Sequence, residues 1–182
     1  GSSYLYNVYG QYKGPLGRWN VRAGRYLVPF GLHAYYDTER LPLVAHESEA
    51  LGVKLDEGVA LLGYLGNLDY SVSVTTGTEN HPTPAVRMGW QGEDSRFGLS
   101  YLFGRLPSVA DQESVETGEL LPGAAPIDKH RLAFDYERLV GPATIRTEPL
   151  LGVDQGKLVL GSYLEASYAL SPKWELSANG AF

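Results

Sequence analysis

The sequence predicts an all-β protein built around one antiparallel up-and-down sheet, and three observations carry that prediction. Apolar and polar residues alternate with a period of two along many segments. Residues that suit tight turns separate these segments. The composition is rich in glycine (22) and tyrosine (13) and has one methionine, which favours strands over helices. The chain also contains no run of about 18 apolar residues, so it predicts no transmembrane helix.

The alternation is clearest in the segment 68–76, where apolar residues occupy even positions and polar residues odd positions. Segments 97–105, 131–137 and 174–182 follow the same pattern. A helix would place apolar residues three and four positions apart, and these segments do not. The pattern predicts about ten strands. We expect them at 3–13, 18–28, 50–64, 68–76, 85–91, 97–106, 130–138, 143–149, 158–170 and 174–182.

Short and long connections alternate between these strands. The short turns lie at 14–17, 65–67, 92–95, 140–142 and 171–173, and the longer links at 29–49, 77–84, 107–129 and 150–157. Membrane barrels have tight turns at the periplasmic end and extended loops at the outer end. Several predicted strands are also long enough to cross a bilayer at a tilt. The sequence therefore predicts an antiparallel transmembrane β-barrel, with 29–49 and 107–129 as long outer or constriction loops.

In such a barrel the apolar face contacts lipid and the polar face lines enclosed water. Aromatic residues near strand ends, among them Trp19, Trp90 and Trp174, fit the girdles found at membrane interfaces, although packing in a core is the alternative for any single one. The charged residues expected to line the pore are Arg18, Arg22, Arg25, Lys54, Asp56, Asp69, Arg87, Arg131, Asp135, Arg146, Glu148 and Glu165. Their alternative role is to pair across neighbouring strands. Arg25 would face lipid unless a bulge at Gly24 turns it inward, so we expect that bulge.

Three short motifs resemble the phosphate-selective O/P type porins of bacterial outer membranes. They are GRYLVPFGL (Gly24 to Leu32), the return strand ALGVKLDEG (Ala50 to Gly58) and the turn LSPKWEL (Leu170 to Leu176). The resemblance extends over about a third of the chain. The resemblance implies a homotrimer of barrels with about sixteen or more strands and an inward-folded loop. The family's phosphate specificity depends on lysine and arginine clusters that this chain does not match. Arg18, Arg22, Arg25 and Lys54 are its nearest residues.

Charge and motifs exclude several other functions. The net charge of −6 argues against nucleic acid as a partner, and the absence of cysteine excludes disulfides and thiolate metal sites. The connection 29–49 carries the residues expected at a constriction: His33, Asp37, Glu39, Arg40, His46 and Glu47. Their spacing matches no known metal site, and a solvated loop is the alternative interpretation. No catalytic motif is present, so we expect neither an enzyme nor a cofactor.

The sequence therefore favours an outer-membrane porin for passive diffusion of small polar or charged solutes, in contact with outer-membrane lipid and lipopolysaccharide. Two alternatives stay open: a structural sleeve around a partner protein such as a cytochrome, and a soluble ligand-binding β-barrel. Residues 1–182 form one domain in this interpretation. Counting strand directions places both ends of the chain on the outer side, which predicts that these residues are part of a larger barrel.

Overall fold

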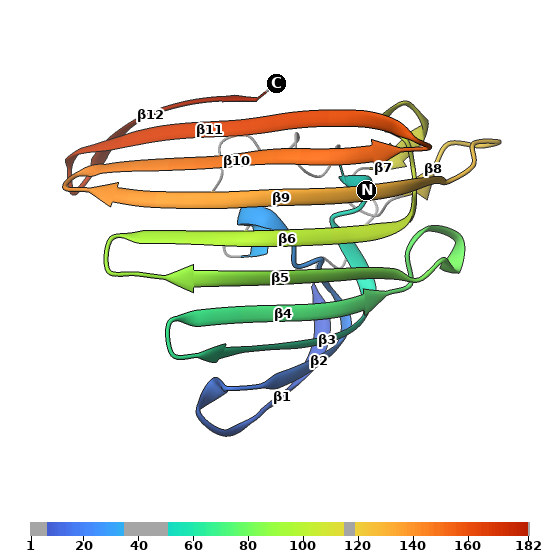
Figure 1. Cartoon of the computed structure of the whole chain (residues 1–182), viewed down its shortest axis with the longest axis horizontal. Coiled ribbons are helices and arrows are strands. Elements are labelled where there is room, and N and C mark those ends of the chain that lie inside the picture. The colour runs from blue at the N-terminus through green and yellow to red at the C-terminus, as the bar shows by residue number, and fades with distance from the viewer. Residues whose placement is uncertain (1–6, 35–50, 115–118, 182) are drawn as a thin grey trace.

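The computed structural model describes residues 7–34, 51–114 and 119–181, and ten strands of this part of the chain form one antiparallel sheet. Each strand pairs with the next one along the sheet, and Figure 1 shows that the sheet is curved. The strands are β1 (Val8–Lys13), β2 (Asn20–Leu27), β3 (Leu55–Leu65), β4 (Leu68–Thr75), β5 (Thr83–Gln91), β6 (Ser95–Leu106), β9 (Ile127–Val140), β10 (Ala143–Asp154), β11 (Lys157–Ser171) and β12 (Trp174–Ala181). The predicted all-β, up-and-down fold is confirmed.

The sheet is open. Among the described residues β1 and β12 are its two edges, and each pairs with one neighbour only. An open sheet of this topology is compatible with part of a barrel. A second, two-stranded sheet of β7 (Gln112–Ser114) and β8 (Glu119–Leu120) lies within the connection between β6 and β9.

The connections differ from the prediction at one place. The link expected at 150–157 does not exist, because β10 continues to Asp154 and β11 begins at Lys157, leaving a turn at Gln155 and Gly156. Long connections still join β2 to β3 and β6 to β9, at the end of the sheet opposite the turn between β3 and β4. Loop length is therefore sorted between the two ends less completely than the sequence suggested.

The two faces of the sheet have opposite chemistry. On the outer face, apolar side chains are exposed: Val72 is 47% exposed, Val74 51% and Leu99 53%. On the inner face, Arg87, Arg131 and Asp135 are at most 1% exposed. The predicted orientation, with apolar residues on the outside and charged residues on the inside, is confirmed for these strands.

The inner face is covered by part of the chain itself. We call residues 28–34 the inner turn. It ends with the 3₁₀ turn η2 (Gly31–Ala34), which lies against β6 and β9 (Figure 1). Phe30 and Leu32 are fully buried. An apolar core forms between this segment and the sheet, and its members are Val28, Phe30, Leu51, Val53, Ala85, Leu102, Leu106, Ala133 and Leu150. The inner face is therefore partly dry, which the expectation of an entirely water-lined face did not include.

The bulge expected at Gly24 is absent. The pairing of β2 with β1 and with β3 runs through Gly24 without a shift of register. Arg22 and Tyr26 share the inner face, where the guanidinium carbon of Arg22 lies 5.8 Å from the centre of the Tyr26 ring. Strict alternation then places Arg25 on the outer face, opposite Glu57 of β3. The expectation that Arg25 lines the inner face is wrong.

The described residues include no helix with the length and apolar character that crossing a membrane requires.

Candidate functional site: a charged inner wall under an inward turn

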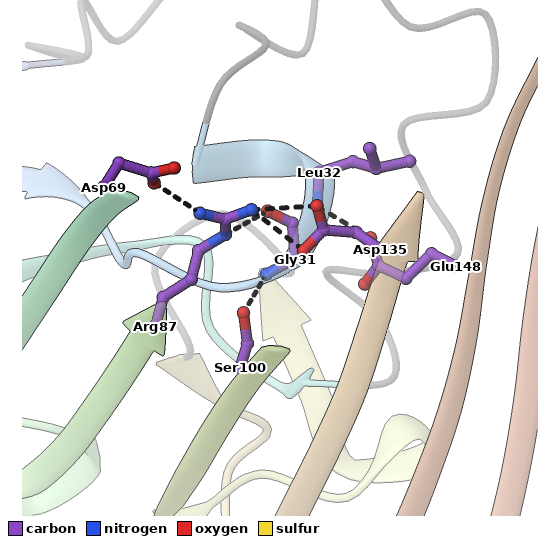
Figure 2. A network of polar contacts seen from close by, with 7 residues as sticks. All are labelled: Gly31, Leu32, Asp69, Arg87, Ser100, Asp135 and Glu148. Carbon is purple, nitrogen blue, oxygen red and sulfur yellow. Dashed lines mark hydrogen bonds and ion pairs between the residues drawn. The ribbon is translucent and has the colours of Figure 1, made fainter. Parts of the chain in front are cut away.

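Arg87 is the centre of the inner face. Its Nη1 donates to Asp69 Oδ2 at 2.8 Å, and its Nη2 donates to Asp135 Oδ1 at 2.8 Å (Figure 2). The strand register explains why these groups meet, because Asp69 pairs with Gly89 on β5 and Asp135 pairs with Gly98 on β6. Gly98 leaves room on the wall beside Asp135, and the guanidinium of Arg87 occupies it.

The same arginine holds the inner turn. Arg87 Nε donates to the carbonyl oxygen of Gly31 at 3.2 Å (Figure 2). The backbone amide of Gly31 donates to Ser100 Oγ at 2.9 Å, and the amide of Leu32 donates to Glu148 Oε2 at 2.7 Å. Side chains from β5, β6 and β10 therefore satisfy the buried backbone groups of the turn, which would otherwise cost free energy. Gly31 suits this position because its φ is +54° and a Cβ there would overlap the Glu148 carboxylate.

Two further arginines of the inner face are bound to carboxylates. Arg146 contacts Glu137 at 2.6 Å and Glu165 at 2.5 Å, and the hydroxyl of Tyr163 donates to Glu165. Arg131 contacts Asp154 Oδ1 at 2.5 Å. Buried pairs of this kind fix side-chain positions, whereas an isolated buried charge is costly. The alternative role that the sequence left open, pairing across strands, therefore describes these residues.

Lys129 differs from the paired arginines of this wall, because its charged group has no hydrogen-bond partner in the described part of the chain. It lies on β9 and is fully buried. It is not among the residues that the sequence predicts to line the pore. Its position two residues before Arg131 could have identified it, because residues two apart on a strand share a face.

A hollow of about 170 Å³ lies beside the inner turn, over β2, β3 and β4. Arg22, Tyr26, Leu62, Tyr64 and Asp69 are among the residues that line it. Neither the hollow nor its mixed lining was predicted. Both arise where a turn from one connection rests on the faces of other strands.

The predicted pore-lining residues fall into two groups. Nine lie at inner-face positions of the strands: Arg22, Asp56, Asp69, Arg87, Arg131, Asp135, Arg146, Glu148 and Glu165. Three do not. Arg18 is exposed in the turn between β1 and β2, Arg25 lies on the outer face, and Lys54 is buried in the segment that precedes β3. The predicted roles of Arg18 and Arg25 are therefore corrected, because Arg18 lies in a turn and Arg25 on the outer face, whereas the predicted role of Lys54 stays a prediction.

The predicted constriction residues are only partly described. The backbone of His33 lies in η2, on the inner side of the sheet. Asp37, Glu39, Arg40, His46 and Glu47 lie outside the described residues, so their predicted role stays a prediction. Within the described part of the chain, no three histidine, aspartate or glutamate side chains come together as ligands for a metal ion.

The glycine at position 98 should be required for the Arg87 network. A Cβ there would overlap Arg87 Nη2 and lie 2.5 Å from Asp135 Oδ2. We expect Gly98→Ala to lower the free energy of unfolding by about 1–3 kcal/mol, the usual effect of overpacking. Urea unfolding followed by tryptophan fluorescence measures this. The matched control is Gly10→Ala on β1, where a Cβ has no atom within 4 Å. Equal stability of the two variants would contradict the packing argument.

Comparison of the chain with models of known protein families gives no match, and a search of curated proteins gives no significant match.

Proposed function

We propose that this chain forms the wall of an outer-membrane pore through which small polar or charged solutes diffuse passively. The observation that carries the proposal is the combination of an exposed apolar outer face with a charged inner face. In a water-soluble β-protein the apolar face is the buried one. In a membrane barrel the apolar face contacts lipid, and the polar groups face the interior.

The extent of the apolar band supports this orientation. On β11, outer-face residues from Leu158 to Tyr168 carry no charge. This stretch advances about 33 Å at about 3.3 Å per residue, which corresponds to about 25 Å of height at the roughly 40° tilt of membrane strands. That is the height of the apolar band in outer-membrane barrels. On β9, charged residues on this face occur at both ends of the apolar stretch, at Asp128 and Arg138.

Aromatic side chains gather at both ends of the band. At the end with the short turns, Tyr12 stacks on Trp19 and Trp90 stacks on Phe97, with ring centroids 5.4 Å apart in each pair. Toward the other end, the hydroxyl of Tyr101, in the middle of β6, lies 2.7 Å from Nδ1 of His130, which is near the start of β9. Aromatic rings with one polar atom favour the boundary between lipid and water. Their positions therefore support the girdles expected from the sequence.

The inner turn specifies what kind of pore this would be. It covers the wall from β5 to β10 and is held there by hydrogen bonds from three strands. Solutes would pass beside it, selected by width and charge, with no covalent step and no cofactor. A sleeve around a partner protein would need an inner face lined mainly by small residues, and Gly98 is one such residue. The structure gives Gly98 another use, because its free space holds the Arg87 guanidinium.

The test is conductance in a planar lipid bilayer. We expect the purified protein, folded in detergent, to insert and give discrete, ohmic current steps, because an enclosed polar wall admits hydrated ions. Heat-denatured protein in the same detergent is the control. A protein that folds only in detergent and gives no steps would favour the sleeve. A protein that stays folded and dispersed without detergent would favour the soluble alternative.

A further inference from the structure

The hollow beside the inner turn has the form of a small binding site. Its volume of about 170 Å³ lies below the roughly 300–1,000 Å³ of pockets that enclose drug-sized ligands, so it suits a small solute. Residues from four strands, β2 to β5, line it on one side, and Pro29 and Ala34 line it on the side of the inner turn. The site is therefore built by the fold and not by one flexible loop.

Arg22 provides the charge of this site. Its Nε donates to Gln11 Oε1 at 3.1 Å, and its guanidinium carbon lies 4.3 Å from the centre of the Tyr9 ring. These two contacts fix the plane of the guanidinium. No carboxylate in the described part of the chain lies within ion-pair distance of Arg22, which sets it apart from Arg87, Arg131 and Arg146. The two Nη groups of Arg22 therefore remain available to an acceptor in the hollow.

The rest of the lining restricts the ligand. Asp69 and Arg87 also line the hollow, but their ion pair of 2.8 Å cancels the two charges. One positive charge remains. The other walls are mostly apolar or aromatic and include Ala60, Leu62 and the rings of Tyr26 and Tyr64, with Ser71 as a neutral polar residue among them. A site with one forked cation and apolar or aromatic walls matches a molecule with one carboxylate and an apolar body.

We propose that the hollow binds a small organic monocarboxylate with an apolar or aromatic body. Its carboxylate accepts hydrogen bonds from Nη1 and Nη2 of Arg22, and its body lies against Leu62, Tyr26 and Tyr64. The proposal deepens the proposed function, and rests on it, because a solute reaches this inner-face site from within the pore. It names the solute class that the pore would select.

The test uses 4-fluorobenzoate as the probe and the full chain in detergent micelles. Fluorine NMR titration gives its dissociation constant, with empty micelles as the background. We expect Arg22→Gln to weaken binding about tenfold or more, the effect of losing hydrogen bonds to a charged group. The matched control is Arg105→Gln, which changes the net charge equally at a side chain that is 46% exposed and paired with Asp128. We expect this variant to bind like the unchanged protein.

Two competitors test the chemistry. Neutral 4-fluorobenzamide should bind at least tenfold more weakly than 4-fluorobenzoate, because it lacks the charge that Arg22 recognises. Inorganic phosphate should displace the probe poorly, because it lacks an apolar body. Equal binding of the amide, displacement by phosphate at equal concentration, or equal losses in the Arg22 and Arg105 variants would each overturn the proposal. The titration does not depend on conductance. A protein that binds the probe through Arg22 but passes no current would refute the pore and leave the binding site standing.

Discussion

Replacing Arg87 with methionine should destabilise this protein more than any other single substitution on the inner wall. The variant leaves the carboxylates of Asp69 and Asp135 without their shared cation, and the Asp135 side chain is only 1% exposed. Breaking a buried pair in this way costs about 3–5 kcal/mol. The carbonyl of Gly31 also loses its donor. We expect urea unfolding in detergent micelles to show this loss in the free energy of unfolding.

A double variant separates the contribution of the buried charges to stability from the contribution of side-chain packing. Arg87→Met combined with Asp135→Leu replaces a buried pair with apolar groups of similar size, so it should recover part of the lost stability. The control for removing an arginine is Arg105→Met, whose exposed pair at 3.6 Å should be worth at most about 1 kcal/mol. If Arg87→Met were no less stable than Arg105→Met, the central role of Arg87 would be wrong.

The Phe30→Ala variant should have a higher single-channel conductance than the unchanged protein, with frequent current fluctuations. Phe30 is fully buried in the apolar core under the inner turn. Truncating such a side chain costs about 3–5 kcal/mol. The loss falls on the contact between the turn and the wall, because the strands keep their own pairing. The turn should then leave the wall for part of the time, which widens the path for ions.

The matched control is Phe103→Ala on the outer face, where the side chain is 38% exposed. It removes the same atoms from the other side of the sheet, so the conductance should not change. Unfolding measurements on both variants show whether the inner turn contributes to stability independently of any current. An unchanged conductance for Phe30→Ala, with the expected loss of stability, would show that the turn does not narrow the ion path.

Errors in the predicted strands had specific physical causes. The sequence predicts a loop at 150–157, a stretch that contains Gly152 and Gly156. Gly152 is in fact inside β10, where a Cβ would lie 2.6 Å from Arg131 Nη1. A glycine can therefore mark a close approach within a strand as well as a turn. The sequence does not separate these two uses, because the neighbour that requires the space comes from another strand.

The contacts that hold the inner turn are a second feature that the sequence could not predict. The sequence correctly predicted that a strand ends near the motif GRYLVPFGL, because β2 ends at Leu27. The residues that hold the turn are Arg87, Ser100 and Glu148, which come from three distant strands. Two of them, Arg87 and Glu148, were predicted to face the interior, but their contact with the turn was not. Hydrogen bonds between elements far apart in sequence leave no local pattern.

The sequence by itself determined that about ten strands pair in chain order in one sheet, and it assigned the faces of most of their side chains correctly, with Arg25 as an exception. It could do so because the period of two is a property of the extended backbone, and because consecutive strands joined by tight turns pair with each other. Only the tertiary structure decided what lies on the inner face. The packing of the inner turn buried Arg87 and left Arg22 beside an open hollow. Two arginines on one face of one sheet thereby acquired different surroundings, since burial depends on what covers a side chain and not on its place in the alternation.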